Sequence, residues 1–392
     1  MNILLVTNLF PTPVDPERGI FTFQLVKRLQ KLCNVTVVCP LPYFPNNKIF
    51  KIFEKYYQFS QVPGKYEIDG IQVYSPKYPL IPKLSESRHA QLMSIGIQKC
   101  IKNLNDKFKF DAVNSHWLYP DSCATQLAIE SLNIPHIATG LGCDINHDLI
   151  DPDKRPQILN MLNKTKYITV VSNDLKNNLI SENIDNKKIF TIENGINFDQ
   201  FNLQNRSECR SELGIDLKIP VILYVGRLSH EKSVTSIISA AAKLRNLNYN
   251  FQVYIVGDGP EENNLRNQAE SLNISDKINF TGKVNHRDIS RWMGASDFFC
   301  LPSIREGCPN VILEALGTGR PVVASRVGAI PDLIDETSGI LFEPENIDEM
   351  VKCFKIALNK KWDENKINNS VKSLSWEHAA EKYYDIYKKS LV

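Results

Sequence analysis

Residues 306–314, EGCPNVILE, place two glutamates eight positions apart around a Gly-Cys-Pro-Asn turn. The stretch follows a buried strand pattern and leads into VILEALGTG, which predicts a helix closed by one of its glycines. Pro309 suits the first turn of this helix, because no N–H is needed there. The backbone N–H groups of Asn310 and Val311 would then form a site for an anion or a hydroxyl group.

The two carboxylates allow two interpretations. Glu306 lies at the mouth of the loop and Glu314 about one turn into the helix, so both can face one cavity and hold a polar ligand from two sides. Alternatively, Glu314 complements the helix dipole and Glu306 is solvated. Taken alone, the stretch does not decide between them.

A second stretch, VGRLSHEKS (225–233), favours ligand binding. It leaves a buried strand with Gly226, presents Arg227 and supplies Lys232 at the start of the next predicted helix. A guanidinium and an ammonium together suit a diphosphate, and two fixed cations can take the place of a metal ion. A solvated Lys–Glu helix start would explain Lys232, but it explains an arginine at a strand end poorly.

Two further loops of the second half carry weaker patterns. VGDGPEENNLR (256–266) indicates a strand, a turn at Gly257 and a helix start, although Asp-Gly is also a common turn. In GKVNHRDISRWM (282–293), Val284 can offer its backbone groups to a base edge.

In the first half, Gly19 follows Arg18 at a predicted helix start, where a glycine lets the backbone approach a phosphate. His116 follows the strand pattern DAVNS; a lone histidine is more often structural than catalytic, and only its position favours a role. GLGCDI (140–145) lacks the third glycine of a dinucleotide-binding motif, but Asp144 is expected at the edge of a ligand cleft. The triplet DPD (151–153) matches a metal-binding motif in form and is interpreted as a turn.

The chain as a whole predicts two domains, because 392 residues exceed what one hydrophobic core usually supports. Short β-branched runs alternate with amphipathic stretches, which indicates parallel sheets flanked by helices. Ligands of such sheets bind outside the carboxyl ends of the strands, so we expect the site in a cleft between the domains. The strand patterns cover residues 2–8, 34–40, 111–117, 136–140 and 167–172, and then 221–227, 251–257, 278–282, 297–303 and 320–325.

The domain boundaries follow from two stretches. Residues 194–208 are polar without a clear period and are interpreted as the linker. Residues 373–391 read as one amphipathic helix, with Ser375 as N-cap, which can fold back onto the first domain. We therefore predict a first domain of residues 1–193 plus 373–392 and a second of residues 194–372.

Composition excludes several classes of protein. A formal net charge of +2 argues against a dedicated nucleic-acid binder. No apolar run reaches the roughly 18 residues of a membrane span, and the first residues, MNILLVTNLFPTP, read as a strand entering a loop. Nine cysteines without a CxxC pair fit a reduced cytoplasmic protein better than a disulfide framework or a zinc site.

The stretches GRLSHEK, VGDGP, GKV and EGCPNVILE resemble, in order and spacing, the second domain of the family 4 retaining glycosyltransferases. The first half resembles the same family through PERGIFTFQLVKRL, SHWLYPDSC, GCDIN, VSNDLK and ENGINFDQF. The resemblance covers essentially the whole chain, and the pair of glutamates is its most specific part. It implies the α/β GT-B fold: two Rossmann-like domains with parallel sheets facing across a cleft, and a last helix that returns to the first domain.

The resemblance also implies roles for residues of this sequence. Glu306 would bind hydroxyl groups of the donor sugar, Glu314 would hold the ribose, and Arg227 and Lys232 would neutralise the diphosphate. The Gly19 amide would approach the diphosphate from the first domain. The implied donor site comprises Gly19, Asp144, Gly226, Arg227, Lys232, Gly257, Val284, Glu306, Gly307, Cys308, Pro309, Asn310, Val311 and Glu314; the implied catalytic residues are His116, Glu306, Arg227 and Lys232, with no metal. The chain departs from the family at Cys308, where phenylalanine is common, and at residues 18–19, where Gly-Gly is frequent.

The expected activity is transfer of a hexose, with retention, from a UDP- or GDP-sugar to a glycan or polyprenyl-diphosphate-linked acceptor of a bacterial surface polysaccharide. Retention without a nucleophile is usually ascribed, for this family, to same-face attack assisted by the departing phosphate. Two alternatives remain: a sugar-nucleotide epimerase of the same fold, and a non-catalytic partner protein that binds sugar nucleotides.

Residues 41–57 and 74–83 are rich in aromatics, lysine and proline. Such a surface suits a peripheral membrane contact, here at the inner face of the cytoplasmic membrane, because anionic lipids attract lysine and rings lie among head groups. An irregular insertion packed on its own domain explains the composition nearly as well.

Overall fold

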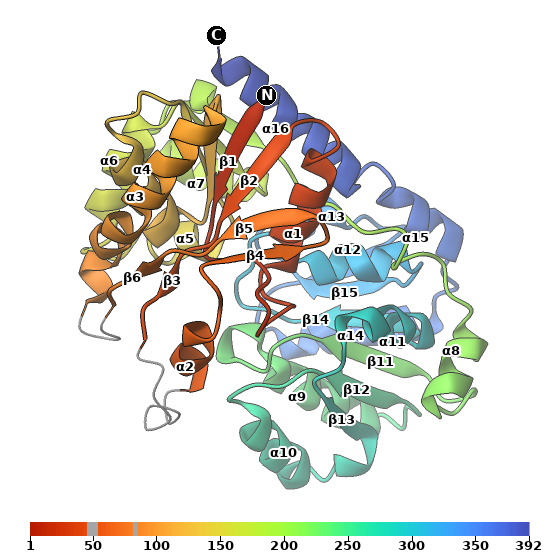
Figure 1. Ribbon diagram of the computed structural model, residues 1–392. Helices are drawn as coiled ribbons and strands as arrows, with labels where there is room; N and C mark the ends of the chain where they lie inside the picture. Colours follow the sequence, from red (N-terminus) through yellow and green to blue (C-terminus); the bar gives the residue numbers. More distant parts are fainter. Residues whose placement is uncertain (45–53, 81–84, 392) are drawn as a thin grey trace. The chain divides into compact units, whose positions relative to one another are not determined.

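The computed structural model describes residues 1–44, 54–80 and 85–391 (Figure 1). The chain forms two compact units, unit 1 of residues 1–194 and 376–392 and unit 2 of residues 195–375. The chain passes between the units twice, and the two connecting segments pair with each other within unit 2. The Ile196 amide donates to the Leu374 carbonyl at 2.8 Å, and Ile196 forms an isolated parallel β-bridge with Ser375. The units therefore divide one and three residues later than the two predicted boundaries.

The sheet of unit 1 has the strand order β10-β9-β8-β7-β1-β2-β5-β4. All neighbours pair in parallel except the antiparallel pair β4–β5. The strands are β1 (Asn2–Val6), β2 (Asn34–Val38), β4 (Lys65–Ile68), β5 (Ile71–Tyr74), β7 (Ala112–His116), β8 (His136–Gly140), β9 (Tyr167–Val170) and β10 (Ile189–Thr191), with β3 (Leu41–Pro42) and β6 (Lys77–Tyr78) as a separate parallel pair.

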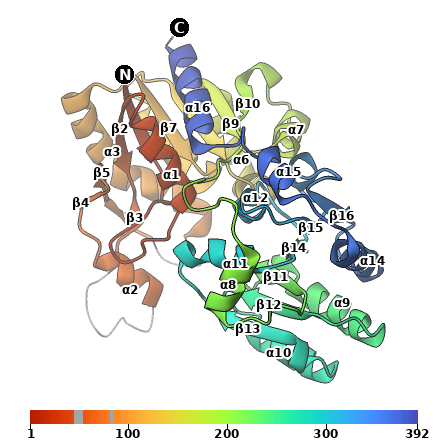
Figure 2. The same ribbon diagram turned by 90° about the vertical axis from the view of Figure 1, so that its right-hand side faces the viewer.

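The helices of unit 1 connect these strands, and the last helix of the chain joins them. They are α1 (Ile20–Leu29), α2 (Glu54–Ser60), α3 (His89–Phe108), α4 (Cys123–Ile129), α5 (Cys143–Asn146), α6 (Arg155–Lys164), α7 (Asn173–Ser181) and α16 (Trp376–Ser390). Helix α16 packs beside α1 (Figures 1 and 2). Its Trp376, Tyr383 and Tyr387 enter the core of unit 1, and Glu377 accepts a hydrogen bond from Arg28 at 3.0 Å. The predicted return of the last helix to the first domain is confirmed.

Unit 2 contains a parallel sheet with the order β13-β12-β11-β14-β15-β16. Its strands are β11 (Val221–Val225), β12 (Gln252–Val256), β13 (Ile278–Gly282), β14 (Phe298–Leu301), β15 (Val322–Ser325) and β16 (Gly339–Phe342). Its helices are α8 (Arg206–Leu213), α9 (Val234–Asn246), α10 (Glu262–Ser271), α11 (Ile289–Ala295), α12 (Asn310–Gly317), α13 (Ile330–Leu333), α14 (Ile347–Asn359) and α15 (Glu364–Ser370).

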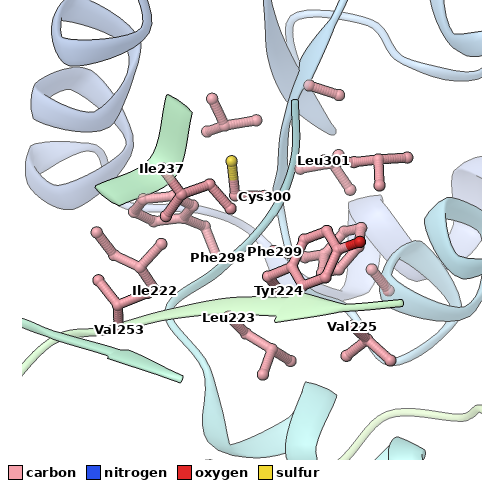
Figure 3. Packing of buried hydrophobic residues seen from close by; sticks show 14 of the residues in the cluster. Ile222, Leu223, Tyr224, Val225, Ile237, Val253, Phe298, Phe299, Cys300 and Leu301 are labelled. Carbon is pink, nitrogen blue, oxygen red and sulfur yellow. The ribbon is translucent and has the colours of Figure 1, made fainter. Parts of the chain in front are cut away.

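The centre of unit 2 is the pair β11 and β14, whose side chains are buried on both faces. Figure 3 shows Phe298, Phe299 and Leu301 packed with Ile222 and Tyr224. A strand buried on both faces reads as a continuous apolar run, and this is why VILYV and FFCL were recognisable in the sequence.

Both sheets reverse their strand order at one point. In unit 1 the order turns between β1 and β7, and in unit 2 between β11 and β14. The loops that leave neighbouring strands in opposite directions at such a point leave a crevice for ligands. The predicted site residues can therefore be compared with two switch points, one in each unit.

The predicted strands agree with the observed ones to within two residues at either end, whereas β3, β4, β5, β6, β10 and β16 were not predicted. The predicted linker was too long. Helix α8 begins at Arg206, because the Asn205 side chain accepts hydrogen bonds from the amides of Ser207 and Glu208 and so caps the helix.

Candidate functional site

The switch point of unit 2 brings one predicted cation and one predicted carboxylate into contact. Lys232 Nζ lies 2.6 Å from Glu306 Oε1, and Ser303 Oγ donates to the same oxygen at 2.6 Å. The two loops are also joined through their backbones, where the Ile304 amide donates to the Glu231 carbonyl at 2.8 Å. Glu306 keeps 9% of its side chain exposed and Lys232 keeps 26%. A polar ligand at this point would meet both charges at once.

Three glycines keep the strand ends beside this pair free of side chains. The Gly226 amide donates to the Val256 carbonyl at 3.0 Å, and the Gly257 amide donates to the Gly282 carbonyl at 2.9 Å. A Cβ on Gly257 would lie 2.0 Å from the Gly226 carbonyl oxygen, and its φ of 134° favours glycine. The carboxyl edge of β11, β12 and β13 is thus bare backbone, which a ligand can approach closely.

Arg227 differs from Lys232 in its surroundings. Its side chain is exposed, and its guanidinium makes no hydrogen bond or ion pair with any described residue. Its carbonyl accepts a hydrogen bond from the Tyr224 hydroxyl at 2.9 Å, which fixes the backbone at this position. The guanidinium of Arg227 therefore has hydrogen-bonding capacity that the described residues do not use.

The loop of Gly307 and Cys308 reaches the start of α12. Pro309 is the N-cap of this helix, with φ −75° and ψ 105°, and not a residue of its first turn as predicted. The first turn contains no acidic residue, so the helix N-terminus carries no negative charge of its own. The Ala329 amide donates to the Gly307 carbonyl at 2.9 Å, which holds the loop from the opposite side. Asn310 and Val311 are the first two residues of α12, as the predicted use of their amides requires.

Glu314 has a partner that the sequence did not indicate. Its Oε1 lies 3.3 Å from His286 Nε2, in the turn that follows β13. Gln200 Nε2 donates to the His286 carbonyl at 2.6 Å, and the His286 ring meets Phe201 edge to face. Val284, two residues earlier, is half-buried against the core of unit 2. The two glutamates thus belong to separate contact groups, each beside a basic side chain.

The switch point of unit 1 contains a buried carboxyl that was not predicted. Asp121 accepts hydrogen bonds from the Asn8 amide and from Asn8 Nδ2, the latter at 2.7 Å. Burial raises the pKa of Asp121 to about 8, and the Asn8 amide and Arg18 oppose this shift. Asn8 in turn accepts a hydrogen bond from Arg18 Nε through its carbonyl at 2.7 Å. The hint in the sequence was the aspartate of SHWLYPDS, which follows β7.

Gly19 lies next to this group as the N-cap of α1, with φ 58°. A Cβ there would lie 2.1 Å from the Leu9 carbonyl oxygen, so only a glycine fits at this position of the loop. The requirement for glycine is therefore explained by packing within unit 1.

His116, which the resemblance implies to be catalytic, lies in the core of unit 1 and not at its surface. Its side chain is 2% exposed, it is held by Asn114 Oδ1 at 3.1 Å, and it stacks on Tyr383 of α16. Its Nδ1 is buried without a hydrogen-bond partner in the described part of the chain. Burial lowers the pKa of His116 to about 3, so the ring is neutral at pH 7. The side chain points into the core because α16 covers that face of the sheet.

Asp144 is also placed differently from the prediction. It is fully buried and accepts hydrogen bonds from the backbone amides of Leu118, Leu141 and Gly142 at 2.8–3.2 Å. Because its carboxylate is occupied by these amides, it fastens the loops after β7 and β8 to each other and has no lone pair directed outward.

The triplet DPD forms a turn. Asp151 Oδ1 accepts hydrogen bonds from the amides of Asp153 at 2.9 Å and Lys154 at 3.3 Å, and Lys154 pairs with Asp148. Elsewhere, none of the helices among the described residues is both long and apolar enough to cross a bilayer. None of the nine cysteines, which all lie within the described residues, forms a disulfide.

The comparisons with known proteins cover both units. Residues 19–200 match the family described as Glycosyltransferase Family 4, and residues 205–373 match Glycosyl transferases group 1. A protein of Bacillus subtilis, the putative teichuronic acid biosynthesis glycosyltransferase TuaC, is 27% identical over 359 residues, which cover 90% of this chain and 88% of that protein.

Solved structures share the fold over nearly the full length. Sucrose-phosphate synthase from Thermosynechococcus elongatus superposes with a TM-score of 0.78 at 17% identity, covering 99% of this chain and 98% of that one. Anabaena Alr3699/HepE in complex with UDP superposes with a TM-score of 0.74 at 16% identity, covering 99% and 100%. The predicted GT-B fold class is confirmed, and the chain belongs to the family 4, group 1 glycosyltransferases.

Proposed function

We propose that this glycosyltransferase moves a hexose, with retention and without a metal ion, from a nucleoside-diphosphate sugar to a glycan or lipid-linked glycan acceptor. The observation that carries the proposal is the contact between Lys232 and Glu306 at the switch point of unit 2, beside the unpaired guanidinium of Arg227. Two structures of Anabaena HepE contain UDP and UDP-glucose, which supports a nucleotide-sugar donor for this chain as well.

The charged residues act on different parts of the donor. Lys232 and Arg227 stabilise the negative charge that grows on the diphosphate as the sugar leaves, and fixed cations act best where water is excluded. Glu306 accepts hydrogen bonds from sugar hydroxyls while Lys232 neutralises it. Glu314, held by His286 at 3.3 Å, accepts from the ribose. The departing phosphate assists attack on the same face of the sugar, so no protein nucleophile is needed.

The first experiment is a panel of sugar nucleotides added to the full chain, with thermal unfolding as the readout. A ligand at 100 times its Kd stabilises by about 2.7 kcal/mol, so the donor should stand out from the rest. Release of nucleoside diphosphate should then depend on an added acceptor. A sugar-nucleotide epimerase would convert the donor into its epimer with or without acceptor, and a non-catalytic protein would bind without turnover.

For the acceptor, the TuaC relative supports a surface polysaccharide, which would place this enzyme in the cytoplasm at the inner face of the membrane. The predicted membrane contact of residues 41–83 rests on the sequence, because residues 45–53 and 81–84 lie outside the described residues. It includes Lys48, Lys51 and Lys55 among Ile49, Phe50, Ile52 and Phe53.

Glutamate at all three lysines tests this contact. Each lysine near an anionic surface contributes about 1 kcal/mol, so the triple variant should bind anionic vesicles at least about 100-fold more weakly while sugar-nucleotide binding is unchanged. High salt should weaken binding of the wild type. If the triple variant binds vesicles with wild-type affinity, the predicted membrane contact is wrong, and the acceptor is reached from solution.

A further inference from the structure

We propose that Arg18 and Lys77 of unit 1 form a binding site for a phosphate group of the acceptor. The proposal rests on the proposed function, because it names the chemical class of the second substrate, a phosphorylated glycan carrier or sugar. It uses described residues of unit 1 alone.

Arg18 is held at the switch point of unit 1 by groups that fix its direction. Its Nε donates to the Asn8 carbonyl at 2.7 Å, and its Nη2 lies 3.4 Å from Asn8 Oδ1. Asn8 itself is fixed by two hydrogen bonds to the buried Asp121. The guanidinium carbon lies 4.8 Å from the centre of the Phe59 ring. One edge of the guanidinium is therefore anchored, and its Nη1 makes no hydrogen bond with a described residue.

Lys77 approaches the same phenylalanine from another element. Its Nζ donates to the Phe59 carbonyl at 2.7 Å, which uses one of the three ammonium protons. Burial lowers its pKa, as expected for an ammonium partly removed from water without a carboxylate beside it. Arg18 lies over the ring of Phe59 and Lys77 contacts its backbone, so both cations border the same residue.

The two cations lack a matching negative charge. Within the described residues neither Arg18 nor Lys77 has a carboxylate within ion-pair distance. Asp121 is linked to Arg18 only through Asn8, and burial raises the pKa of its carboxyl to about 8. Most partly buried basic side chains pair with an acid, since an unpaired buried charge is costly. Two cations beside Phe59 without an acidic partner among the described residues are accordingly suited to an anion.

A phosphate suits this pair better than a single carboxylate. A phosphomonoester or a diphosphate carries about two negative charges, matches two cations, and offers three or more acceptor oxygens to the guanidinium fork and the ammonium. Arg227 and Lys232 of unit 2 are proposed for the donor diphosphate, and the pair in unit 1 is assigned to the other substrate.

The test is isothermal titration of three probes into the full chain: inorganic phosphate, glucose 1-phosphate and geranyl diphosphate. Every protein also carries Arg227→Ala, so that binding at the unit 2 loops is weakened. Arg18→Gln and Lys77→Gln each remove one charge. The conservative variants Arg18→Lys and Lys77→Arg keep the charge and report on folding. Lys65→Gln is the matched control, because Lys65 is an exposed lysine of the same unit that touches only the Tyr74 ring.

We expect one saturable phosphate site whose Kd rises about 10-fold or more in each glutamine variant, since a charge-assisted hydrogen bond is lost. Lys65→Gln and the two conservative variants should bind within about 3-fold of the parent. Tighter binding of geranyl diphosphate would identify a lipid carrier, and tighter binding of glucose 1-phosphate a sugar phosphate.

Equal affinity in the parent and both glutamine variants, or no saturable phosphate binding by the parent, would overturn the proposal. Its failure is separate from that of the proposed function. If no sugar nucleotide stabilises the chain, the donor assignment fails, whereas the phosphate titration still reports on Arg18 and Lys77.

Discussion

Removal of Lys232 or of Arg227 should lower activity strongly, but only the removal of Lys232 should destabilise the fold. In Lys232→Ala, the mostly buried Glu306 loses its partner at 2.6 Å and keeps the hydrogen bond from Ser303. Breaking a fully buried ion pair costs about 3–5 kcal/mol. Because Lys232 is partly exposed, a cost of about 1–3 kcal/mol is expected here. For a unit of this size, that lowers Tm by roughly 2–12 °C.

Arg227→Ala is the matched comparison. The side chain is exposed and makes no hydrogen bond or ion pair with the described residues, so its removal should change stability by less than about 0.5 kcal/mol. Both variants should lose on the order of 100-fold or more in kcat/KM, since each removes a charge from the leaving diphosphate.

The double variant Lys232→Ala/Glu306→Gln separates the two effects. Glutamine removes the stranded charge while keeping the shape, so most of the lost Tm should return, whereas activity should not. Thermal unfolding and steady-state kinetics are measured for wild type, Lys232→Ala, Arg227→Ala and the double variant. Equal melting of Lys232→Ala and wild type, or an Arg227→Ala variant as unstable as Lys232→Ala, would refute the reasoning.

Three further outcomes are expected. Gly257→Ala should destabilise unit 2 by about 2–5 kcal/mol in thermal unfolding, because its Cβ would lie 2.0 Å from the Gly226 carbonyl oxygen at a positive φ. The control Gly64→Ala, whose Cβ would have no atom within 4 Å, should melt like wild type. Burial lowers the pKa of His116 from 6.5 to about 3, so between these pH values the unfolded chain binds more protons than the folded one. The free energy of unfolding should therefore fall as pH falls through this window, by up to about 1.4 kcal/mol per pH unit. His116→Gln should flatten that slope in unfolding measured from pH 4 to 7, and an unchanged slope would contradict the burial of the ring. Activity should persist in EDTA. If EDTA abolishes activity and added metal restores it, the enzyme needs a metal ion, and residues 151–153 become candidate ligands.

Much of the fold was predictable because of how parallel sheets are built. The central strands are covered on both faces, so β1, β11 and β14 are apolar runs that stand out from the amphipathic stretches around them. The strands that were missed are short or lie at the sheet edges, such as β10 and β16, where part of the surface is polar. The linker was overextended because Asn205 looks like another polar residue until its side chain is seen to cap α8.

The sequence by itself also determined which residues could bind charge, since Arg227, Lys232, Glu306 and Glu314 stand at the ends of predictable strands and helices. Local pattern carries this information, because the carboxyl ends of parallel strands face the same edge of a sheet.

Only the tertiary structure decided which of these groups meet. Lys232 contacts Glu306 across 74 positions and Asn8 contacts Asp121 across 113. His116 became a core residue because α16, from the far end of the chain, lays Tyr383 against it, while Ser115 turns to the opposite face toward His136. Alternation along a strand gives two faces, but the identity of what covers each face depends on segments distant in sequence. The direction of a side chain, and hence its function, follows from that packing.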